Sequence, residues 1–398
     1  MVQIIHISDF HLDSYPISTP KKRLVEALIL DLEKQIIDTS KCIIAISGDL
    51  IDKGGYKFSS IKNAFESFKK VFIHELSEKL SIKKEQFFFV PGNHDIDRNK
   101  IDCIVESGIA KEVSTLDGIN KFIIDNRKKS KYLDRIEDYK IFERGYYDNL
   151  NIKKELSNFD SCFLTDNNVG VACFNSVWRS SNENDNGQLI LGEKQVEFAI
   201  DFLKDANVRI AIMHNPLTDL VECDLEKVKP ILYRNFDVLL IGHKHFVDIE
   251  YTKNFHGSLL SCQSNASVAD FSDDKYQNGY AIINFIKGGN TIIQYRKYLP
   301  DFVKFVSNTD VGTDDGCISI VYPDEKQIYR SAIIDKALDT LRNVRFENVN
   351  EHLFTYGLDP SIPCRINDLF VEPTITNIPE THSDTDNIKY YHISDFVN

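Results

Sequence analysis

The sequence predicts an α/β protein whose centre is a sheet rich in parallel strands. Five short apolar runs each end abruptly in polar residues of the kinds that bind metal ions. Continuous runs of β-forming residues are typical of strands that are buried on both faces of a sheet. Amphipathic stretches of helical length separate several of the runs, and this alternation favours parallel strands whose ligands gather at their carboxyl ends. The runs are residues 2–7, 42–46, 87–90, 208–213 and 237–241.

Three stretches have the periodicity of amphipathic helices. Residues 20–38 begin with a proline, which suits the first turn of a helix, and leucines recur there every four residues. Residues 59–80 and 193–205 follow the same pattern. We therefore expect these three stretches to be the helices that alternate with the strands.

Residues 98–165 interrupt this alternation with a charged stretch that predicts a mostly helical insertion. From Arg98 to Tyr147 there are 11 Lys or Arg and 9 Asp or Glu, a net charge of +2 in a chain that is otherwise acidic. We expect this insertion to form a lid or wall that selects the substrate. Within it, residues 127–131 are a candidate contact for backbone phosphates, with a solvated helix face as the alternative.

The second half of the chain has a different pattern. Short runs separated by turns between residues 247 and 321 predict a second, largely antiparallel sheet. A further helix is expected at 328–342, followed by an acidic tail that contains prolines. These features suggest one domain at 1–322 and a C-terminal helix with an acidic connector at 323–398.

The composition is that of an ordinary globular protein. The 398 residues are 42% hydrophobic and 27% charged, which excludes wholesale disorder. No apolar run approaches the roughly 18 residues of a membrane helix, and no segment has the pattern of a signal peptide. Eight scattered cysteines without a Cys-x-x-Cys pair predict buried, reduced thiols in a cytoplasmic protein without a membrane partner. The net charge of −13 argues against non-specific nucleic-acid binding, but not against a local basic groove.

The polar clusters after the strands have the chemistry of a metal site. Asp9 and His11 are two residues apart, so in an extended strand their side chains would share a face and bind one ion together. His243 and His245 repeat this spacing. A carboxylate such as Asp49 can bridge two ions that are about 3.5–4 Å apart. Carboxylate, imidazole and amide ligands without thiolate favour Mn²⁺, with Fe, Zn or Ni as alternatives.

Together the clusters resemble the pattern of the calcineurin-like metallophosphoesterase superfamily, which is D-x-H, G-D-x-x-D, G-N-H-D/E, H and G-H-x-H. All five blocks are intact, and the resemblance covers approximately residues 1–322. It implies a four-layer α-β-β-α sandwich with two divalent metal ions. The blocks are Asp9-Phe-His11, Gly48-Asp49-Leu-Ile-Asp52, Gly92-Asn93-His94-Asp95, His214 and Gly242-His243-Lys-His245.

The resemblance also implies a role for each of these residues. The first metal ion would be held by Asp9, His11, Asp49 and His245. The second would be held by Asp49, Asn93, His214 and His243. His94 would be the general acid that protonates the leaving oxygen or orients the phosphate, supported by Asp52 and by Asp95, which would fix the orientation of His94.

Three further residues are candidate substrate contacts. Arg98 follows the Gly-Asn-His-Asp block and would reach a phosphate oxygen, or else form a surface ion pair. Asn175 and Trp178 follow the predicted strand 169–174 and would line the cleft, where Trp178 would stack on a base. As the only tryptophan, Trp178 is equally a candidate anchor of the core.

The best interpretation is a two-metal phosphodiesterase, most specifically a nuclease. The acidic balance favours the alternative of a cyclic or small nucleotide as substrate, whereas the +2 insertion favours nucleic acid. His214 is followed by Asn215, where relatives that act on cyclic nucleotides often have a second histidine. A non-catalytic sensor or interaction module on the same fold is a further alternative, and the intact ligand set argues against it.

The C-terminal tail suggests a larger context. Residues 366–373 and 393–398 are similar to the connector that precedes a STAND or NACHT-type NTPase in large bacterial defence proteins. No nucleotide-binding P-loop occurs among the 398 residues, so any such NTPase partner lies outside this sequence. The chain is therefore interpreted as the N-terminal effector module of a longer antiviral defence protein, with an ordinary acidic tail that packs across the domain or stays mobile as the alternative. It is compatible with an oligomer, but its sequence predicts no interface.

Overall fold

The computed structural model describes residues 1–129, 131–181, 185–269, 277–321, 375–376 and 390–391. The chain divides into two units, Met1–Tyr322 and Pro323–Asn398. In the second unit the described residues form one antiparallel pair, β15 (Ile375–Thr376) with β16 (Tyr390–Tyr391). The helix predicted at 328–342 lies outside the described residues, and so do the connector motifs.

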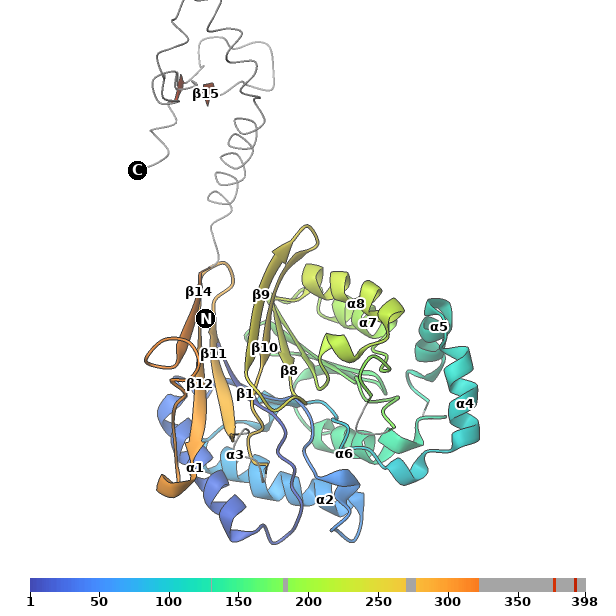
Figure 1. The fold of residues 1–398 in the computed structure, drawn as a ribbon, viewed down its shortest axis with the longest axis horizontal. Coiled ribbons are helices and arrows are strands. Elements are labelled where there is room, and N and C mark those ends of the chain that lie inside the picture. Colours follow the sequence, from blue (N-terminus) through green and yellow to red (C-terminus); the bar gives the residue numbers. More distant parts are fainter. Residues whose placement is uncertain (130, 182–184, 270–276, 322–374, 377–389, 392–398) are drawn as a thin grey trace, which may run out of the picture. The chain divides into compact units, whose positions relative to one another are not determined.

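Two seven-stranded sheets form the centre of the first unit (Figure 1). The first has the order β13-β12-β11-β1-β2-β3, and β14 also pairs with β12. Its strands are β1 (Val2–Ile7), β2 (Ile43–Ile46), β3 (Phe87–Phe89), β11 (Gly279–Phe285), β12 (Asn290–Leu299), β13 (Lys304–Ser307) and β14 (Cys317–Val321). The second has the order β4-β5-β6-β7-β8-β10-β9. Its strands are β4 (Lys153–Leu156), β5 (Asp160–Leu164), β6 (Val169–Phe174), β7 (Val208–Met213), β8 (Val238–Ile241), β9 (Asp248–Asn254) and β10 (Gly257–Gln263).

The five apolar runs form parallel strands as predicted, but they are divided between two sheets rather than gathered in one, and the predicted separate antiparallel sheet is wrong. Strands β1, β2 and β3 are parallel, as are β6, β7, β8 and β10. The strands after His245 are shared between the two sheets instead. Strand β10 pairs with β8, whereas β11 pairs antiparallel with β1, with Val2 opposite Phe285. The local apolar pattern does not specify such long-range partners, which is why the sequence could not assign them.

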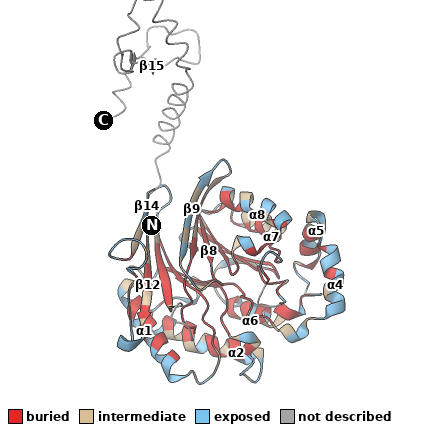
Figure 2. Ribbon diagram, viewed as in Figure 1, coloured by how far each residue is buried: buried red, intermediate tan, exposed pale blue. Residues whose placement is uncertain are grey.

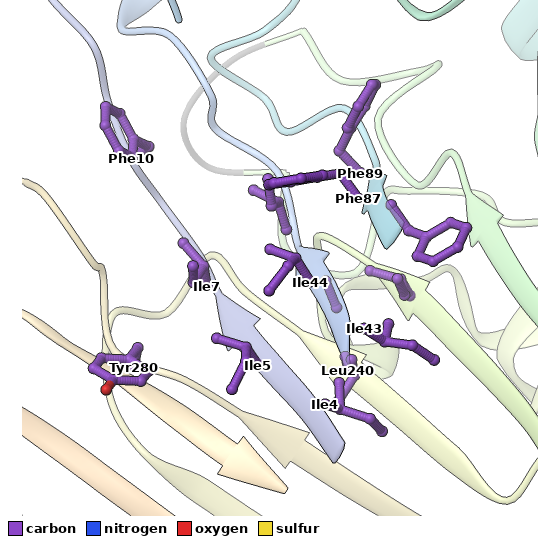
Figure 3. Close-up of a cluster of buried hydrophobic side chains, with 14 of the residues drawn as sticks. Ile4, Ile5, Ile7, Phe10, Ile43, Ile44, Phe87, Phe89, Leu240 and Tyr280 are labelled. Carbon is purple, nitrogen blue, oxygen red and sulfur yellow. The ribbon is translucent and has the colours of Figure 1, made fainter. Parts of the chain in front are cut away.

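The continuous apolar runs are explained by burial on both faces. In β6, Val171 faces the core between the two sheets, and its neighbour Ala172 faces the helices that cover the second sheet. Ile210 and Ala211 divide in the same way in β7. Ile4 of the first sheet and Leu240 of the second belong to one buried cluster, so the two sheets pack face to face (Figure 3).

Helices cover the outer faces of both sheets and complete the sandwich (Figures 1 and 2). The first sheet is covered by α1 (Thr19–Gln35), α2 (Ile61–Phe68) and α3 (Glu75–Leu80), and a π-helical turn at Lys69–His74 joins the last two. The second is covered by α7 (Glu193–Phe202) and by α8 (Glu222–Asn235), which the sequence analysis did not predict. The three predicted helices are thus confirmed, with ends that differ by a few residues.

The helical insertion is shorter than predicted. It consists of α4 (Cys103–Glu112), α5 (Leu116–Asn126) and α6 (Glu137–Tyr147). Beyond it, β4 and β5 form a hairpin at the edge of the second sheet, because β5 pairs with β6. Helix α6 lies along β3, the edge strand of the first sheet. The hydroxyls of Tyr139 and Tyr147 donate to the carbonyls of Phe89 and Phe87, at 3.1 and 2.8 Å.

The structure also bears on the expectations about membrane helices and cysteines. Among the described residues, no helix combines the length and the apolar character needed to cross a bilayer. The seven described cysteines are all free thiols. The expectation that they are buried is wrong for Cys103 and Cys223, which are exposed near the starts of α4 and α8.

Candidate metal centre

The predicted ligand clusters converge at the carboxyl ends of the parallel strands. Each follows one of β1, β2, β3, β7 and β8, and backbone hydrogen bonds join the loops that carry them. The amide of Asp9 donates to the carbonyl of Gly48 at 3.1 Å, and the amide of Gly242 donates to the carbonyl of His214 at 3.0 Å. The parallel topology thus places five distant segments at one edge of the sandwich.

The first group of converging atoms comes from Asp9, His11 and His245. Nε2 of His245 lies 3.0 Å from Oδ1 of Asp9 and 3.4 Å from Nε2 of His11. Nε2 of His11 lies 3.8 Å from the same Asp9 oxygen. Two imidazole nitrogens and one carboxylate oxygen that face a common point are a donor set that fits a divalent cation.

The second group is built around Asp49, whose Oδ2 lies between the two groups. This oxygen is 3.7 Å from Nε2 of His11 and 3.4 Å from Nε2 of His214. Nε2 of His214 also lies 3.0 Å from Oδ1 of Asn93, and the rings of His214 and His243 are 5.1 Å apart. Asp49 is therefore positioned to bridge two cations, one on each side.

The electrostatics of the two groups suit cation binding. Burial would raise the pKa of Asp49, but the charges of His214, His94 and His11 hold it well below its usual range. Burial alone would lower the pKa of His214, but the Asp49 carboxylate raises it to about 9. Burial and then the charge of His214 lower the pKa of His243 to about 4. In the metal-free chain at neutral pH, His214 therefore carries a proton that a cation at its Nε2 must displace.

The backbone at the candidate ligands is in a conformation that few residues adopt. The φ angles of Asp9, His11 and Asp49 are 51°, 46° and 52°, and those of His243 and His245 are 73° and 55°. The prediction that Asp9 and His11 share a strand face is therefore wrong, because β1 ends at Ile7 and both residues are left-handed. Such strain costs roughly 1–3 kcal/mol per residue and persists where the surrounding structure requires it, typically at functional sites.

Close packing at Gly92 explains one of the motif glycines. A Cβ atom at this position would lie 2.1 Å from Oδ1 of Asp49 and 2.3 Å from its backbone nitrogen. Any other residue here would displace the carboxylate that is placed between the two groups. Glycine is thus needed for the close approach of the two loops.

His94 contacts one of its two predicted supporting carboxylates, Asp52. Nδ1 of His94 contacts Oδ1 of Asp52 at 2.9 Å, and the ring lies 4.6 Å from the ring of His11. Burial would lower the pKa of His94, but the charge of Asp49 and the Asp52 contact raise it.

The role predicted for Asp95 is not supported by its contacts. Its carboxylate is fully buried and accepts hydrogen bonds from the backbone amides of Leu50, Ile51 and Gly92, at 3.1, 3.0 and 2.8 Å. Asp52, rather than Asp95, therefore orients the ring of His94. Asp95 instead holds the loops after β2 and β3 together.

The prediction that Asn175 and Trp178 line the cleft is wrong. The Trp178 indole is 1% exposed, donates to the carbonyl of Ile190 at 2.6 Å and stacks on Phe122. Asn175 is equally buried, and its side chain donates to the carbonyl of Asn158 at 3.0 Å. Both residues anchor the junction between the helical insertion and the second sheet.

The two predicted basic contacts differ in their surroundings. Nη2 of Arg98 lies 3.4 Å from the backbone carbonyl of Asn93, so this residue is beside the site and stays a predicted substrate contact. In the segment 127–131, Arg127 is paired with Glu155 and Asp160 and is not available to a phosphate. Lys128 and Lys129 in the same segment are exposed.

Sequence reasoning missed two residues beside the centre. Oδ2 of Asp219 lies 3.7 Å from Nε2 of His243, in a turn just beyond the His214 block that belongs to none of the five motif blocks. Nζ of Lys21, almost fully buried in the first turn of α1, donates to the backbone carbonyl of His11 at 3.0 Å. A lysine at the start of an amphipathic helix would normally face solvent, so its sequence context gave no signal.

Comparisons with known proteins agree with this architecture. A family model described as calcineurin-like phosphoesterase matches residues 2–247. The uncharacterized metallophosphoesterase-like protein YydB of Bacillus subtilis (strain 168) is 22% identical over 278 residues, which are 68% of this chain and 54% of that protein. The chain thus spans about half the length of this curated relative.

Two solved structures with similarity to the chain are covered to different extents. Wild-type Vps29 from Entamoeba histolytica, complexed with Zn²⁺, has 9% identity and a TM-score of 0.28, over 80% of this chain and 99% of that one. The sulfate thiohydrolase SoxB of Thermus thermophilus, in complex with glycerol, has 11% identity and a TM-score of 0.38, over 78% of this chain and 58% of that one.

Proposed function

The chain belongs to the calcineurin-like phosphoesterase family, whose members are metal-dependent phosphoester hydrolases, and from this premise we propose that it is a two-metal phosphodiesterase acting on nucleic acid. The observation that carries the proposal is the position of Asp49 between His11 and His214, with further ligand atoms converging on each side. Such an arrangement suits a pair of divalent cations that share one carboxylate.

Seven residues would hold the two cations. The first would be bound by Asp9, His11, Asp49 and His245. The second would be bound by Asp49, Asn93, His214 and His243. When bound, the two cations would neutralise the charge of the scissile phosphate and lower the pKa of the attacking water. We propose Mn²⁺ as the physiological cation, because oxygen and imidazole donors dominate the set and thiolates are absent from it.

His94 would supply the proton that the leaving oxygen needs. Its Nδ1 is taken up by the contact with Asp52, so Nε2 is the nitrogen left to donate to the substrate. The charge of Asp49 and the Asp52 contact raise the pKa of His94 and so favour the protonated ring that a general acid requires. In this mechanism Asp52 holds the ring in one orientation throughout the reaction.

Exposed aromatic side chains a few residues beyond two of the ligand blocks support a nucleic-acid substrate. Tyr15 and Tyr56 lie in the loops that follow the first two ligand blocks, and both are more than half exposed. Nζ of Lys70 lies 6.0 Å from the ring of Tyr15, and Nζ of Lys57 lies 5.4 Å from the ring of Tyr56. Either exposed ring can stack on a base. Lys70 is the cation available to the adjacent phosphate, because Lys57 is paired with Asp13 at 3.0 Å.

A substrate panel tests the proposal. Purified protein with Mn²⁺ is assayed against plasmid DNA, single-stranded oligonucleotides, RNA and cyclic nucleotides. We expect cleavage of a nucleic acid that is lost in Asp49→Ala and slowed mainly through KM in Tyr56→Ala, with the remote Phe255→Ala as the matched control. Hydrolysis of cyclic nucleotides alone would favour the small-nucleotide alternative. Biological activity that survives Asp49→Ala together with His94→Ala would favour a non-catalytic module.

We also propose that the chain is the effector module of a longer bacterial defence protein located in the cytoplasm. The support is the similarity of residues 366–373 to a connector before a STAND or NACHT-type NTPase, and the greater length of the curated relative. The test is a phage challenge of cells that express the complete gene. Protection that is lost in Asp49→Ala would agree with the proposal, and unchanged protection would contradict it.

A further inference from the structure

A row of buried polar side chains leads to Oδ2 of Asp9, the carboxylate oxygen that does not face His245. It consists of His6 at the end of β1, Ser47 just after β2, and Ser8, all fully buried. Nε2 of His6 lies 2.9 Å from Oγ of Ser47, and Oγ of Ser47 lies 2.8 Å from Oγ of Ser8. Ser8 in turn contacts Oδ2 of Asp9. None of these three residues contributes an atom to the groups that converge on the cations.

The contacts determine the direction of every hydrogen bond in this row. Oδ2 of Asp9 can only accept, so the Ser8 hydroxyl must donate to it. Ser8 then has only lone pairs left for Ser47, which must donate its own proton to Ser8. Ser47 can therefore only accept from His6, so the proton of the neutral imidazole is on Nε2. All three hydrogen bonds point toward the carboxylate.

The hydrogen bonds of this row end at one oxygen of Asp9, Oδ2, and the other oxygen, Oδ1, remains available to the cation. Oδ2 accepts from Ser8 and from the backbone amide of His243, the latter at 3.1 Å. Oδ1 faces Nε2 of His245 at 3.0 Å, at the centre of the first group of ligand atoms. Two donors on Oδ2 fix the plane of the carboxylate, so Oδ1 is directed at the cation position.

His6 is an unexpected residue for a purely structural position. Its Nδ1 is buried and has no hydrogen-bond partner among the residues that the structure describes. Burial lowers the pKa of His6 to about 3, so the ring stays neutral and its orphaned nitrogen stays unprotonated. An apolar ring of similar size would avoid this unsatisfied atom, which indicates that the Nε2 proton is the feature that matters.

The packing around the serines restricts them to this arrangement. A Cβ atom on Gly242 would lie 2.3 Å from Oγ of Ser8 and 3.0 Å from Oγ of Ser47, so the glycine of the Gly-His-x-His block closes over the row. The backbone of Ser8 is held separately, because its amide donates to Oγ of Ser267 at 3.2 Å and its carbonyl accepts from the Ser267 amide at 2.8 Å.

We propose that His6, Ser47 and Ser8 form a one-directional hydrogen-bond relay that orients Asp9 for the first metal ion, with His6 as a positioning residue that never touches the ion or the substrate. The relay acts as the outer-shell partner of a metal-binding carboxylate, and loss of such a partner typically weakens metal binding about 10–100-fold. The proposal concerns metal binding, so it does not depend on which phosphodiester the chain cleaves.

Titration of the metal-free full chain with Mn²⁺ by isothermal calorimetry tests the relay. In His6→Phe the donor is lost but the ring shape is kept, and we expect one Mn²⁺ site to weaken about 10–100-fold while the other changes little. The thermal midpoint of this variant without metal should equal or exceed that of the wild type. His6→Gln, whose amide can donate to Ser47, should recover most of the affinity.

Ser267→Ala is the matched control, because it removes a buried hydroxyl that contacts Ser8 through the backbone but not through the relay. It should lower the thermal midpoint and leave the Mn²⁺ affinity within about twofold of the wild type. Wild-type Mn²⁺ affinity in His6→Phe would overturn the proposal, as would a Gln variant no better than Phe. A wild-type chain that binds two Mn²⁺ ions but cleaves no phosphodiester would overturn the proposed function alone.

Discussion

Raising the pH should destabilise the metal-free protein through a single buried histidine. His214 is fully buried, its Nδ1 donates to the carbonyl of Ser47 at 2.7 Å, and its Nε2 lies 3.4 Å from Oδ2 of Asp49. Burial opposes the charge on this ring, but the Asp49 carboxylate outweighs it and raises the pKa from 6.5 to about 9. The folded metal-free chain thus binds a proton on His214 that the unfolded chain loses at a lower pH.

The size and sign of the effect follow from this difference. A shift of about two and a half pKa units corresponds to about 3 kcal/mol, since each unit contributes about 1.4 kcal/mol. The folded-state pKa lies above the unfolded one, so this stability is fully present below about pH 6.5. It is lost as the pH rises through about 9, and above that value His214 contributes nothing further.

Urea unfolding in the presence of a chelator, at a series of pH values from 6 to 10, measures this loss. The matched control is His214→Gln, whose amide can still donate to Ser47 but does not titrate. His94 and His245, whose pKa values are also raised, titrate in both proteins, so the difference between the curves reports His214 together with its effect on the pKa of His245. Saturating Mn²⁺ should remove the part of the wild-type pH dependence that comes from His214, because the cation replaces the proton. Curves that fall in parallel between pH 6.5 and 9 would refute the reasoning.

Three further substitutions test separate parts of the molecule. Asp52→Asn removes the acceptor that holds His94, so kcat should fall about 10–100-fold by steady-state kinetics while elemental analysis finds the same metal content. Trp178→Ala should cost about 3–5 kcal/mol in urea unfolding and leave KM unchanged, whereas a raised KM at full stability would restore the base-stacking role. Gly92→Ala places a methyl group against Asp49, so calorimetry should find at least one Mn²⁺ site lost, and two intact sites would contradict the packing argument.

The strands and the ligand clusters could be predicted because two simple constraints act on them together. Strands buried on both faces need continuous apolar runs, as Val171 and Ala172 illustrate by facing different cores. Parallel strands also present their carboxyl ends at one edge, so polar residues directly after such runs must lie near one another. Asp9 and Asp49 follow neighbouring parallel strands of the first sheet and converge for this reason. His214 follows β7 of the second sheet and joins them because the two sheets pack face to face.

Other features depend on contacts that a local pattern does not contain. The pairing of β11 with β1 joins segments nearly the whole domain apart, and no periodicity identifies that partner. Trp178 follows a strand at the ligand edge, yet it turns inward because Phe122 and Ile190 complete a pocket for its ring. The left-handed backbone of Asp9 is likewise imposed by neighbouring loops rather than by the residue itself.

The tyrosine contacts between α6 and β3 have a practical consequence for anyone who engineers this chain. A bare edge strand offers unpaired carbonyls and amides to other molecules, and natural proteins usually blunt or cover such edges. Here Tyr139 and Tyr147 occupy two of these carbonyls. A truncated protein without the helical insertion would therefore expose β3 as an edge strand that other molecules can pair with. Activity lost through the resulting aggregation would be mistaken for evidence that the insertion is needed for catalysis.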